Sequence, residues 1–499
     1  MNWPRGYVVG GSSVLNAILY VRCSPKDYDE WESVHGCTGW SHKDVLPYFM
    51  RSEGMTPRKV DSTVDPKYHN FDGPYRVTEL GPEHVNPFAV DFVESAVNHG
   101  LKRNPDYNAA EQQGVFHPHI STDRGVRCDT FTAYIKNTKA DQRPNLVVQA
   151  NTFVQKVVFD GNKKATGVIV RRGKSLDEAR KAPEEFIRCK REVVLSGGAI
   201  GSPWILMNSG VGPKQHLAEV GIPCIEDLPV GQNLKDHLYT CVLYKTKDGE
   251  HDQKPVGLAE YIAGIEQHDK DGTGAISTAL LEALAFWSSG VEPKTRTDLE
   301  IHFSASFAGN NPFFLAGTGL KSWDPENQIP YGVSPLPTLC NPKSVGEIKL
   351  ASNDPFEHPI IDPRYLTHED DWEILRRGIR TAREIMKKDP IASKVVGEVR
   401  LPTVDEKVDM ESDEYINAII RDTSTTVYHP TTTCRMGPDG DANSVVDLHL
   451  RVRGVKGLRV IDASIMPELV SGNTNAPSIM IGEKGAAHIL EDHPDLYAH

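Results

Sequence analysis

A short C-terminal stretch, residues 427–484, gathers side chains that could remove a proton and stabilise the negative charge left behind. His429 supplies an imidazole, the side chain whose ordinary pKa lies closest to neutral. Asn473 supplies an amide that can hydrogen-bond a substrate oxygen. Pro477 suits the first turn of a helix, and a helix N-terminus attracts anions. The stretch therefore favours a reaction that moves a proton and leaves negative charge on a bound molecule.

Two elements must position these side chains. Residues 458–461 read as a short buried strand, and Asp462 follows at its carboxyl end, where α/β sheets hold their ligands. A helix is expected from residue 478 to about residue 490. The polar group at the strand end and the positive end of the helix would then serve the same site.

The rest of the chain predicts further helices and strands. Helices are expected as a pair within 31–51, over 87–99, from a Ser202 cap and Pro203 to Gly210, and after a capping box at 367–370. The charged residues 174–190 are expected to form a solvated linker. Alternating apolar residues predict strands at 146–149, 153–159, 166–171, 298–307 and 346–351, and 192–196 is expected to be a buried strand.

Composition bounds the kind of protein. The 499 residues suffice for two or three packing units, and 39% hydrophobic with 25% charged residues is ordinary for a soluble globular protein. A net charge of -13 argues against nucleic acid as a partner, and no run of 18 apolar residues predicts a membrane span. The 8 cysteines include no Cys-x-x-Cys pair, so no metal site is expected. The first residues show no signal peptide, which leaves the compartment open, an extracellular full-length protein included.

Four stretches resemble signatures of the glucose-methanol-choline (GMC) family of flavin oxidoreductases. They are residues 5–16, 198–212, 227–237 and 427–477, and the resemblance runs from about Trp3 to the end of the chain. Because the stretches occur in the family's order, coincidence explains them poorly. Tyr428 and residues 473–477 resemble the corresponding residues of arthropod glucose dehydrogenase-like members. This resemblance implies a quinone or a similar electron acceptor.

The resemblance implies FAD as the cofactor and names residues that would hold it. In the family, the glycine-rich stretch at 10–16 lines the flavin ring and the pyrophosphate; by itself, this stretch could be a tight strand-to-helix turn. Leu15 stands where some relatives carry a histidine bonded to FAD, so non-covalent FAD is expected. The implied FAD-binding residues are Gly10, Gly11, Ser12, Asn16, Val154 at the adenine, Asp462, Ala463, Asn475, Ala476 and Pro477.

The same resemblance assigns the catalytic roles. His429, directly before Pro430, matches the family's catalytic histidine, which takes the hydroxyl proton of an alcohol. Asn473 matches a position that is His or Asn in the family, and it is expected to hydrogen-bond the substrate oxygen, with a turn-forming asparagine as the plainer reading. Thr432 replaces the family's usual glycine. Because a β-branched residue resists the conformations open to glycine, the loop near His429 is expected to differ.

The expected fold is α/β with two domains: a Rossmann-like FAD-binding domain from discontinuous segments, and a substrate domain with an antiparallel sheet and helices. Family members open with a βαβ unit that carries Gly-x-Gly-x-x-Gly, which does not occur in this sequence, so that segment is expected to be missing. The FAD-binding domain is expected in 1–60, 126–237 and 427–499, a lid segment of the substrate domain in 61–125, and the rest of that domain in 238–426.

The expected function is FAD-dependent oxidation of the CH–OH group of an alcohol or sugar, with hydride transfer to flavin N5 and a quinone or oxygen as the electron acceptor. Two alternatives stay open. The chain could be an inactive family member that holds no FAD, or a lyase that cleaves cyanohydrins on the same scaffold without net redox change. Flavin absorption tests the first alternative. Release of cyanide and aldehyde without reduction of an acceptor tests the second.

Overall fold

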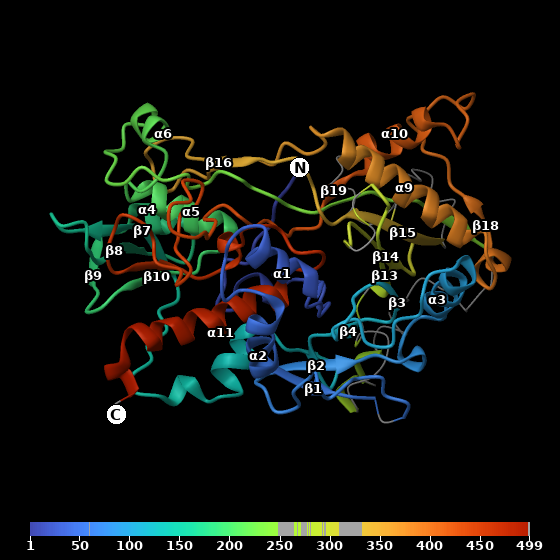
Figure 1. Ribbon diagram of the computed structural model, residues 1–499, viewed down its shortest axis with the longest axis horizontal. Coiled ribbons are helices and arrows are strands. Elements are labelled where there is room, and N and C mark those ends of the chain that lie inside the picture. Colours follow the sequence, from blue (N-terminus) through green and yellow to red (C-terminus); the bar gives the residue numbers. More distant parts are fainter. Residues whose placement is uncertain are drawn as a thin grey trace.

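The computed structural model describes residues 1–58, 60–247, 264–266, 268–270, 277, 279, 281–291, 293, 296–308 and 332–497. Figure 1 shows a large sheet with its helices at one end of the molecule and a smaller group of strands and helices at the other. Between them lie helices α1 (Pro25–Ser33), α2 (His42–Ser52) and α11 (Asn475–Asp492), and α11 packs against α2. The N-terminal end of α11 therefore lies near the middle of the molecule, and the helix runs outward from there toward the C-terminus.

The largest sheet among the described residues has eight strands, all paired antiparallel. Its main path is β18-β12-β15-β14-β13-β3, and β11 pairs with both β15 and β19. The strands are β3 (Gly114–Phe116), β11 (Leu238–Tyr239), β12 (Tyr244–Thr246), β13 (Leu281–Trp287), β14 (Leu299–Ser304), β15 (Gly332–Leu339), β18 (Val395–Glu398) and β19 (Thr425–Thr426).

The two faces of this sheet have different neighbours. Helices α3 (Pro87–His99), α9 (Glu369–Met386) and α10 (Asp413–Thr423) accompany it, and Phe303 of β14 stacks on Phe92 of α3 with ring centroids 4.4 Å apart. Because side chains alternate along a strand, Glu300 and His302 lie on the opposite face of β14. On that face Glu300 lies near Cys340, whose Sγ is 4.0 Å from Glu300 Oε2.

Smaller sheets build the other end of the molecule. Strands β10 (Val193–Leu195) and β20 (Leu458–Val460) pair in parallel, which joins two segments far apart in the sequence. Beside them, β7 (Thr152–Phe159), β8 (Ala165–Arg172) and β9 (Glu185–Arg188) form an antiparallel sheet. The remaining elements include α4 (Leu176–Lys181), α5 (Gly198–Asn208), α6 (Lys214–Glu219), β1 (Glu53–Thr56), β2 (Tyr75–Glu79), β4 (His119–Ile120), β5 (Thr122–Asp123), β6 (Val126–Arg127), β16 (Glu347–Lys349) and β17 (Ile360–Asp362).

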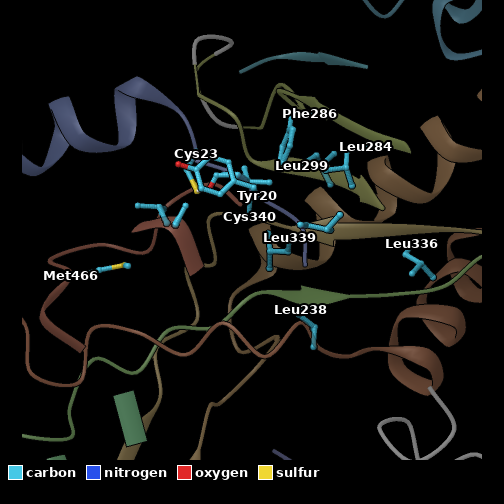
Figure 2. Close-up of a cluster of buried hydrophobic side chains, with 14 of the residues drawn as sticks. Tyr20, Cys23, Leu238, Leu284, Phe286, Leu299, Leu336, Leu339, Cys340 and Met466 are labelled. Atoms are coloured by element: carbon cyan, nitrogen blue, oxygen red, sulfur yellow. The ribbon is translucent and has the colours of Figure 1, made fainter. Parts of the chain in front are cut away.

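Apolar side chains from distant segments share one core. Figure 2 shows Tyr20 and Cys23 of the N-terminal segment together with Leu238 and Leu299 of the large sheet and Cys340, which follows β15. All five are at most 3% exposed. The α/β architecture with an antiparallel sheet confirms the predicted fold class. The five predicted domain segments stay a prediction, and part of 238–426 lies outside the described residues.

Most helix predictions are confirmed. Helix α3 covers 87–99 as expected, and two helices form a pair as expected, although α1 begins at Pro25, before the predicted range of 31–51. Helix α11 begins at Asn475, earlier than predicted, and keeps Pro477 in its first turn. The capping box predicted at 367–370 does not form. His368 is the N-cap of α9, and its side chain accepts a hydrogen bond from the Asp370 N–H. No described helix is both long and apolar enough to cross a membrane.

Two predictions around the small sheets are wrong. Residues 146–149 form no strand, and their apolar side chains are 39–75% exposed, because no described strand runs beside them to pair with their backbone. Residues 174–190 are not a plain linker, since they form α4 and β9. Strand β9 pairs with β8 at the sheet edge, where ion pairs such as Arg172–Glu185 at 3.0 Å replace the apolar alternation that would have revealed it.

The start of α5 also differs from the prediction. Ser202 and Pro203 lie inside the helix, which begins at Gly198. The Ser202 hydroxyl accepts the N–H of Gly197 at 2.9 Å and donates to Asp462 at 2.6 Å, so the helix start is held from a distant strand end. Gly210 follows the helix with φ of 80°, the left-handed turn expected there.

Candidate active site

His429 lies in the loop after β19, and polar contacts hold the backbone there. Its N–H donates to Asp236 Oδ1 at 2.6 Å, and the carbonyl of Tyr428 accepts a hydrogen bond from Arg5 at 2.7 Å. Tyr428 has φ of 64°, a conformation that residues with a side chain rarely adopt. The surrounding contacts hold this strained loop, which fixes where the imidazole points.

Asp236 is the buried anchor of the loop. Its other carboxylate oxygen accepts hydrogen bonds from the hydroxyls of Thr426, at 2.5 Å, and Tyr365. Burial raises the pKa of Asp236 to about 6, although these donors and the Arg5 guanidinium favour its charged form. The carboxylate is therefore ionised above pH 6, with a donor for each oxygen.

The His429 ring contacts two side chains. Its Nδ1 lies 2.9 Å from Nδ1 of His237, and His237 Nε2 donates to the Cys340 carbonyl at 2.9 Å. Its Nε2 lies 3.4 Å from the amide nitrogen of Asn473. The two residues assigned to catalysis from the sequence, 44 positions apart, are thus brought together.

The electrostatic surroundings keep the His429 ring neutral. Burial lowers the pKa of His429 well below its ordinary value, and His237, His302 and Arg5 lower it further. A neutral imidazole keeps one lone pair, so the ring can accept a proton at neutral pH.

Asn473 leads into the N-terminus of α11. Its Oδ1 is buried and makes no hydrogen bond to any described residue. The next residue, Thr474, provides no side-chain cap, so the first backbone N–H groups of α11 point out of the helix without a side-chain acceptor. The Asn475 amide donates to the Tyr75 hydroxyl at 2.8 Å, while Ala476 and Pro477 are buried in the first turn.

Glycine backbone shapes another part of the site. Gly10 and Gly11 have φ of 99° and 55°, and a Cβ on Gly11 would meet no atom within 4 Å. The hydroxyl of Ser12 accepts a backbone N–H of the same loop at 3.2 Å. The amide oxygen of Asn16 accepts from Arg127 at 2.7 Å. These polar side chains therefore brace the loop, and its glycine backbone is the part left open.

Asp462 ties the strand β20 to α5. One carboxylate oxygen accepts from Gly198 N–H at 2.9 Å and from the Ser202 hydroxyl, and the other accepts from Ser464 N–H at 2.8 Å. Because the carboxylate is fully engaged within the protein, only the backbone of Asp462 and Ala463 is left for a ligand. Gly198 has φ of 71°, with no atom within 4 Å of a Cβ there.

Val154 lies farther along the small sheets. It is half-buried in β7, opposite Val170 of β8, and the register shifts between Val154 and Lys156. Helix α5 packs against β7, which connects this strand to the Gly198 turn.

Known proteins match this chain along most of its length. The family profiles of the GMC oxidoreductases match residues 1–239 and 342–482. Oxygen-dependent choline dehydrogenase of Rhizobium rhizogenes is 36% identical over 505 residues, which cover 98% of this chain and 82% of that protein. The chain belongs to the GMC oxidoreductase family.

Further known proteins match almost the whole chain as well. Mitochondrial choline dehydrogenase of Homo sapiens is 37% identical over 503 residues, covering 99% of this chain and 77% of that protein. Among solved structures, pyridoxine 4-oxidase from Mesorbium loti has a TM-score of 0.80 at 28% identity, covering 98% of this chain and 85% of that one. A formate oxidase has a TM-score of 0.84 at 25% identity, covering 99% and 85%.

FAD is the cofactor of this GMC oxidoreductase, and the residues present fit it. Gly11 and Gly198 let backbone approach a flat ring or a phosphate closely, because open space stands where a side chain would be. The N-terminus of α11 suits negative charge on a bound flavin. FAD supplies the hydride acceptor that no side chain can provide. Leu15 offers no atom for a covalent bond, and non-covalent binding stays a prediction, as do the individual FAD contacts.

Thr432 corrects one expectation. It has φ of 70°, so the β-branched residue does adopt the left-handed conformation expected to be reserved for glycine. Its hydroxyl donates to the Asn233 carbonyl, which holds this conformation against the steric strain.

Sequence reasoning missed Asp236, His237 and Arg5 as parts of the site. Asp236 and His237 end the third signature, 227–237, whose resemblance was noted without a role. Arg5 opens the first signature. Each signal was therefore present as a motif, but only the fold brings these residues to His429.

One group of side chains outside this site has metal-ligand chemistry. Among the described residues, ligand atoms of His449, His488 and Glu491 lie within 4.8 Å of one another. The two imidazole rings stack, with centroids 4.4 Å apart and planes 28° apart. Lone pairs lie in the ring planes, so stacked rings do not direct them at one point, and this arrangement does not form a coordination site.

Proposed function

We propose that this protein oxidises the CH–OH group of an alcohol with FAD, and that His429 removes the hydroxyl proton. The observation that carries the proposal is the neutral, buried His429 ring, whose Nε2 lies 3.4 Å from the Asn473 amide at the start of α11. Nε2 accepts the hydroxyl proton, and the Asn473 amide orients the alcohol oxygen. Burial of both side chains excludes water from the reacting group.

A cationic alcohol such as choline is the substrate we propose to test first. Relatives named choline dehydrogenases support it. Glu300 supports it as well, because its fully buried side chain lies on the inner face of the sheet, and its Oε1 makes no aligned hydrogen bond although His302 Nε2 lies 3.0 Å away. Phe286 lies opposite Glu300 and adds an aromatic side chain. A buried carboxylate beside an aromatic ring favours a cation over a neutral sugar.

The register of the sheet connects Glu300 to the catalytic residues. Tyr239 pairs with Thr338, and Thr338 pairs with Glu300, so the three side chains share one face. His237 lies two residues before Tyr239, on that same face. His302, also on this face, lowers the pKa of His429, which supports placing this face over the reacting group.

Oxygen is the acceptor we propose first, since the bacterial relatives are named oxygen-dependent. The test gives purified protein choline or glucose, with oxygen or a quinone dye as the acceptor. We expect choline-dependent uptake of oxygen and formation of the corresponding aldehyde. Oxidation of glucose but not choline would reject the cationic substrate, and reduction of the dye alone would reject oxygen.

The same preparations separate the remaining alternatives. Cleavage of a cyanohydrin without reduction of any acceptor would replace the oxidoreductase by a lyase. Protein that stays colourless after incubation with FAD and desalting would point to the inactive, FAD-free family member.

A further inference from the structure

We propose that His237 is a positioning residue that holds His429 in the tautomer whose bare nitrogen, Nε2, faces the substrate. The proposal rests on the proposed role of His429 as the base. It assigns a function to the Asp236–His237 pair that ends the 227–237 signature. It follows from which atoms can donate and which can only accept.

The Cys340 carbonyl fixes one proton of His237, because a carbonyl oxygen only accepts hydrogen bonds. His237 Nε2 lies 2.9 Å from that oxygen, so Nε2 carries a proton. The position of His237 beside this carbonyl is set by the sheet, where its neighbour Leu238 pairs with Leu339.

The charge of the His237 ring follows from its burial. Burial lowers the pKa of His237 to about 3, although the carbonyls of Cys340 and Val470 oppose this shift. The His237 ring is therefore neutral at neutral pH, and a neutral imidazole carries only one proton. With that proton on Nε2, Nδ1 of His237 is a pure acceptor.

The short contact between the two rings determines which nitrogen of His429 carries the proton. The two Nδ1 atoms lie 2.9 Å apart, a hydrogen-bond distance that requires one proton between them. His237 has none to give at Nδ1, so the proton belongs to His429 Nδ1. Because His429 is neutral as well, its Nε2 is bare.

The position of the Asn473 amide independently supports the same tautomer of His429. The group facing His429 Nε2 is the amide nitrogen of Asn473, a donor, at 3.4 Å. A donor suits a bare ring nitrogen and would oppose a protonated one. The lone pair of Nε2 thus lies next to the amide proposed to hold the alcohol.

The proton transfer balances with this assignment. The O–H bond of the alcohol breaks, its proton forms an N–H bond at His429 Nε2, and its electron pair stays on the alcohol oxygen. The ring becomes imidazolium while Nδ1–H stays hydrogen-bonded to His237. Asp236 meanwhile holds the His429 backbone N–H, so two consecutive residues hold the backbone and the ring of the base.

Two variants of similar size test the acceptor. His237→Asn places an amide oxygen near the position of Nδ1, whereas His237→Leu places a methyl group there and offers no acceptor. We expect His237→Leu to lower kcat by about 10²–10⁴-fold, as loss of a tautomer-setting partner does in catalytic triads, and His237→Asn to recover at least about tenfold of that loss. Equal activity of the two variants, or wild-type activity in His237→Leu, would overturn the proposal.

A spectroscopic test needs no activity and no folded variant of His237. In wild-type protein labelled with ¹⁵N-histidine, the resonances of His429 are assigned by their loss in His429→Ala. We expect the Nδ1 shift of a protonated nitrogen and the Nε2 shift of a bare one. The reverse pattern would overturn the tautomer assignment, whereas failure of every alcohol to react would overturn the proposed function and leave the tautomer result standing.

Discussion

The two sides of the site are held by different kinds of atoms. Around His429, side chains hold the loop and the ring. Asp236 accepts a hydrogen bond from the backbone N–H of His429, His237 contacts the ring, and both side chains belong to residues at most 3% exposed. At the glycine-rich loop, the backbone forms the surface that would contact the cofactor, since Gly11 leaves open space and the neighbouring Leu15 is 52% exposed. A base must be aimed by specific hydrogen bonds, whereas a flat cofactor needs room for close approach.

The two sides of the site should therefore respond differently to substitution. Substitutions on the base side should remove turnover and leave FAD bound. Substitutions on the glycine side should weaken FAD binding and leave the imidazole in place. The following variants test that separation.

The largest effect is expected for His429→Ala. Loss of the base should lower kcat by about 10²–10⁴-fold, because His429 Nε2 is the ring nitrogen that lies beside the Asn473 amide proposed to hold the alcohol. Steady-state kinetics with choline and an acceptor measure this, and the flavin content per protein should stay that of wild type. His449→Ala, a histidine outside the site, is the control and should keep full activity. A His429→Ala enzyme as fast as this control would contradict the assignment.

Asp236 should make stability depend on pH. Its pKa is raised from an ordinary 3.8 to about 6, so the folded chain binds the proton more tightly than the unfolded chain. The corresponding stabilisation is full below pH 4 and is lost as pH rises through 6, a change of about 3 kcal/mol. Denaturant unfolding of wild type and Asp236→Asn at pH 4 and pH 7 isolates it, because other groups cancel in the difference. A difference that does not vary with pH would show that Asp236 has an ordinary pKa.

Glu300 should matter for a cationic substrate alone. Glu300→Gln removes the buried charge and should raise KM for choline by about 10–100-fold, the usual loss for a hydrogen bond or contact to a charged group. A neutral alcohol should keep its KM. Glu491→Gln, an exposed carboxylate, is the matched control. An equal rise in KM for both alcohols would mean that Glu300 supports the sheet rather than the substrate.

Gly11→Val tests the other side. At φ of 55° a Cβ costs about 1–2 kcal/mol, and the added side chain would fill the open space. FAD affinity should fall by at least about 5–30-fold, measured by flavin fluorescence during titration. Gly161→Val also adds a side chain in open space, in an exposed turn of the β7–β8 hairpin, and should bind FAD like wild type. Unchanged FAD affinity in Gly11→Val would remove this loop from the cofactor site.

Thr432 should show the smallest effect. Thr432→Ala keeps the strain of φ 70° and loses the hydroxyl bond to Asn233, whereas Thr432→Gly loses the bond and the strain. Thr432→Gly should therefore be more stable than Thr432→Ala by about 1 kcal/mol in denaturant unfolding. The opposite order would show that the loop carries no strain at this position.

The sequence predicted the parts of this fold that carry strong local patterns. Helix α3 has an apolar stripe and a Pro start, and its bounds agree with the structure. Strand β20 and its following Asp462 were also found, since residues 458–461 are apolar except for Arg459. The segment 146–149 has the same kind of pattern, yet it forms no strand, because a strand exists only beside a partner that local sequence cannot reveal.

Contacts between distant residues explain most of what the sequence missed. Ser202 looked like a helix cap, but its hydroxyl binds Asp462, 260 positions away. His237 and His429 lie 192 positions apart, and nothing in either local pattern predicts that their rings meet. The family resemblance predicted His429 and Asn473 as catalytic residues, which stays a proposal, while the residues that position the His429 loop and ring came only from the fold.

The most direct test of the account is an anaerobic titration of the FAD-loaded protein with choline, followed by visible absorption. Wild type should lose the oxidised-flavin bands as choline is added. His429→Ala should show the same bands at the start and keep them on the timescale of wild-type turnover. Wild-type bands unchanged by choline and by neutral alcohols, or equally fast loss of the bands in His429→Ala, would contradict the central claim that a side-chain-held His429 drives alcohol oxidation by a backbone-held flavin.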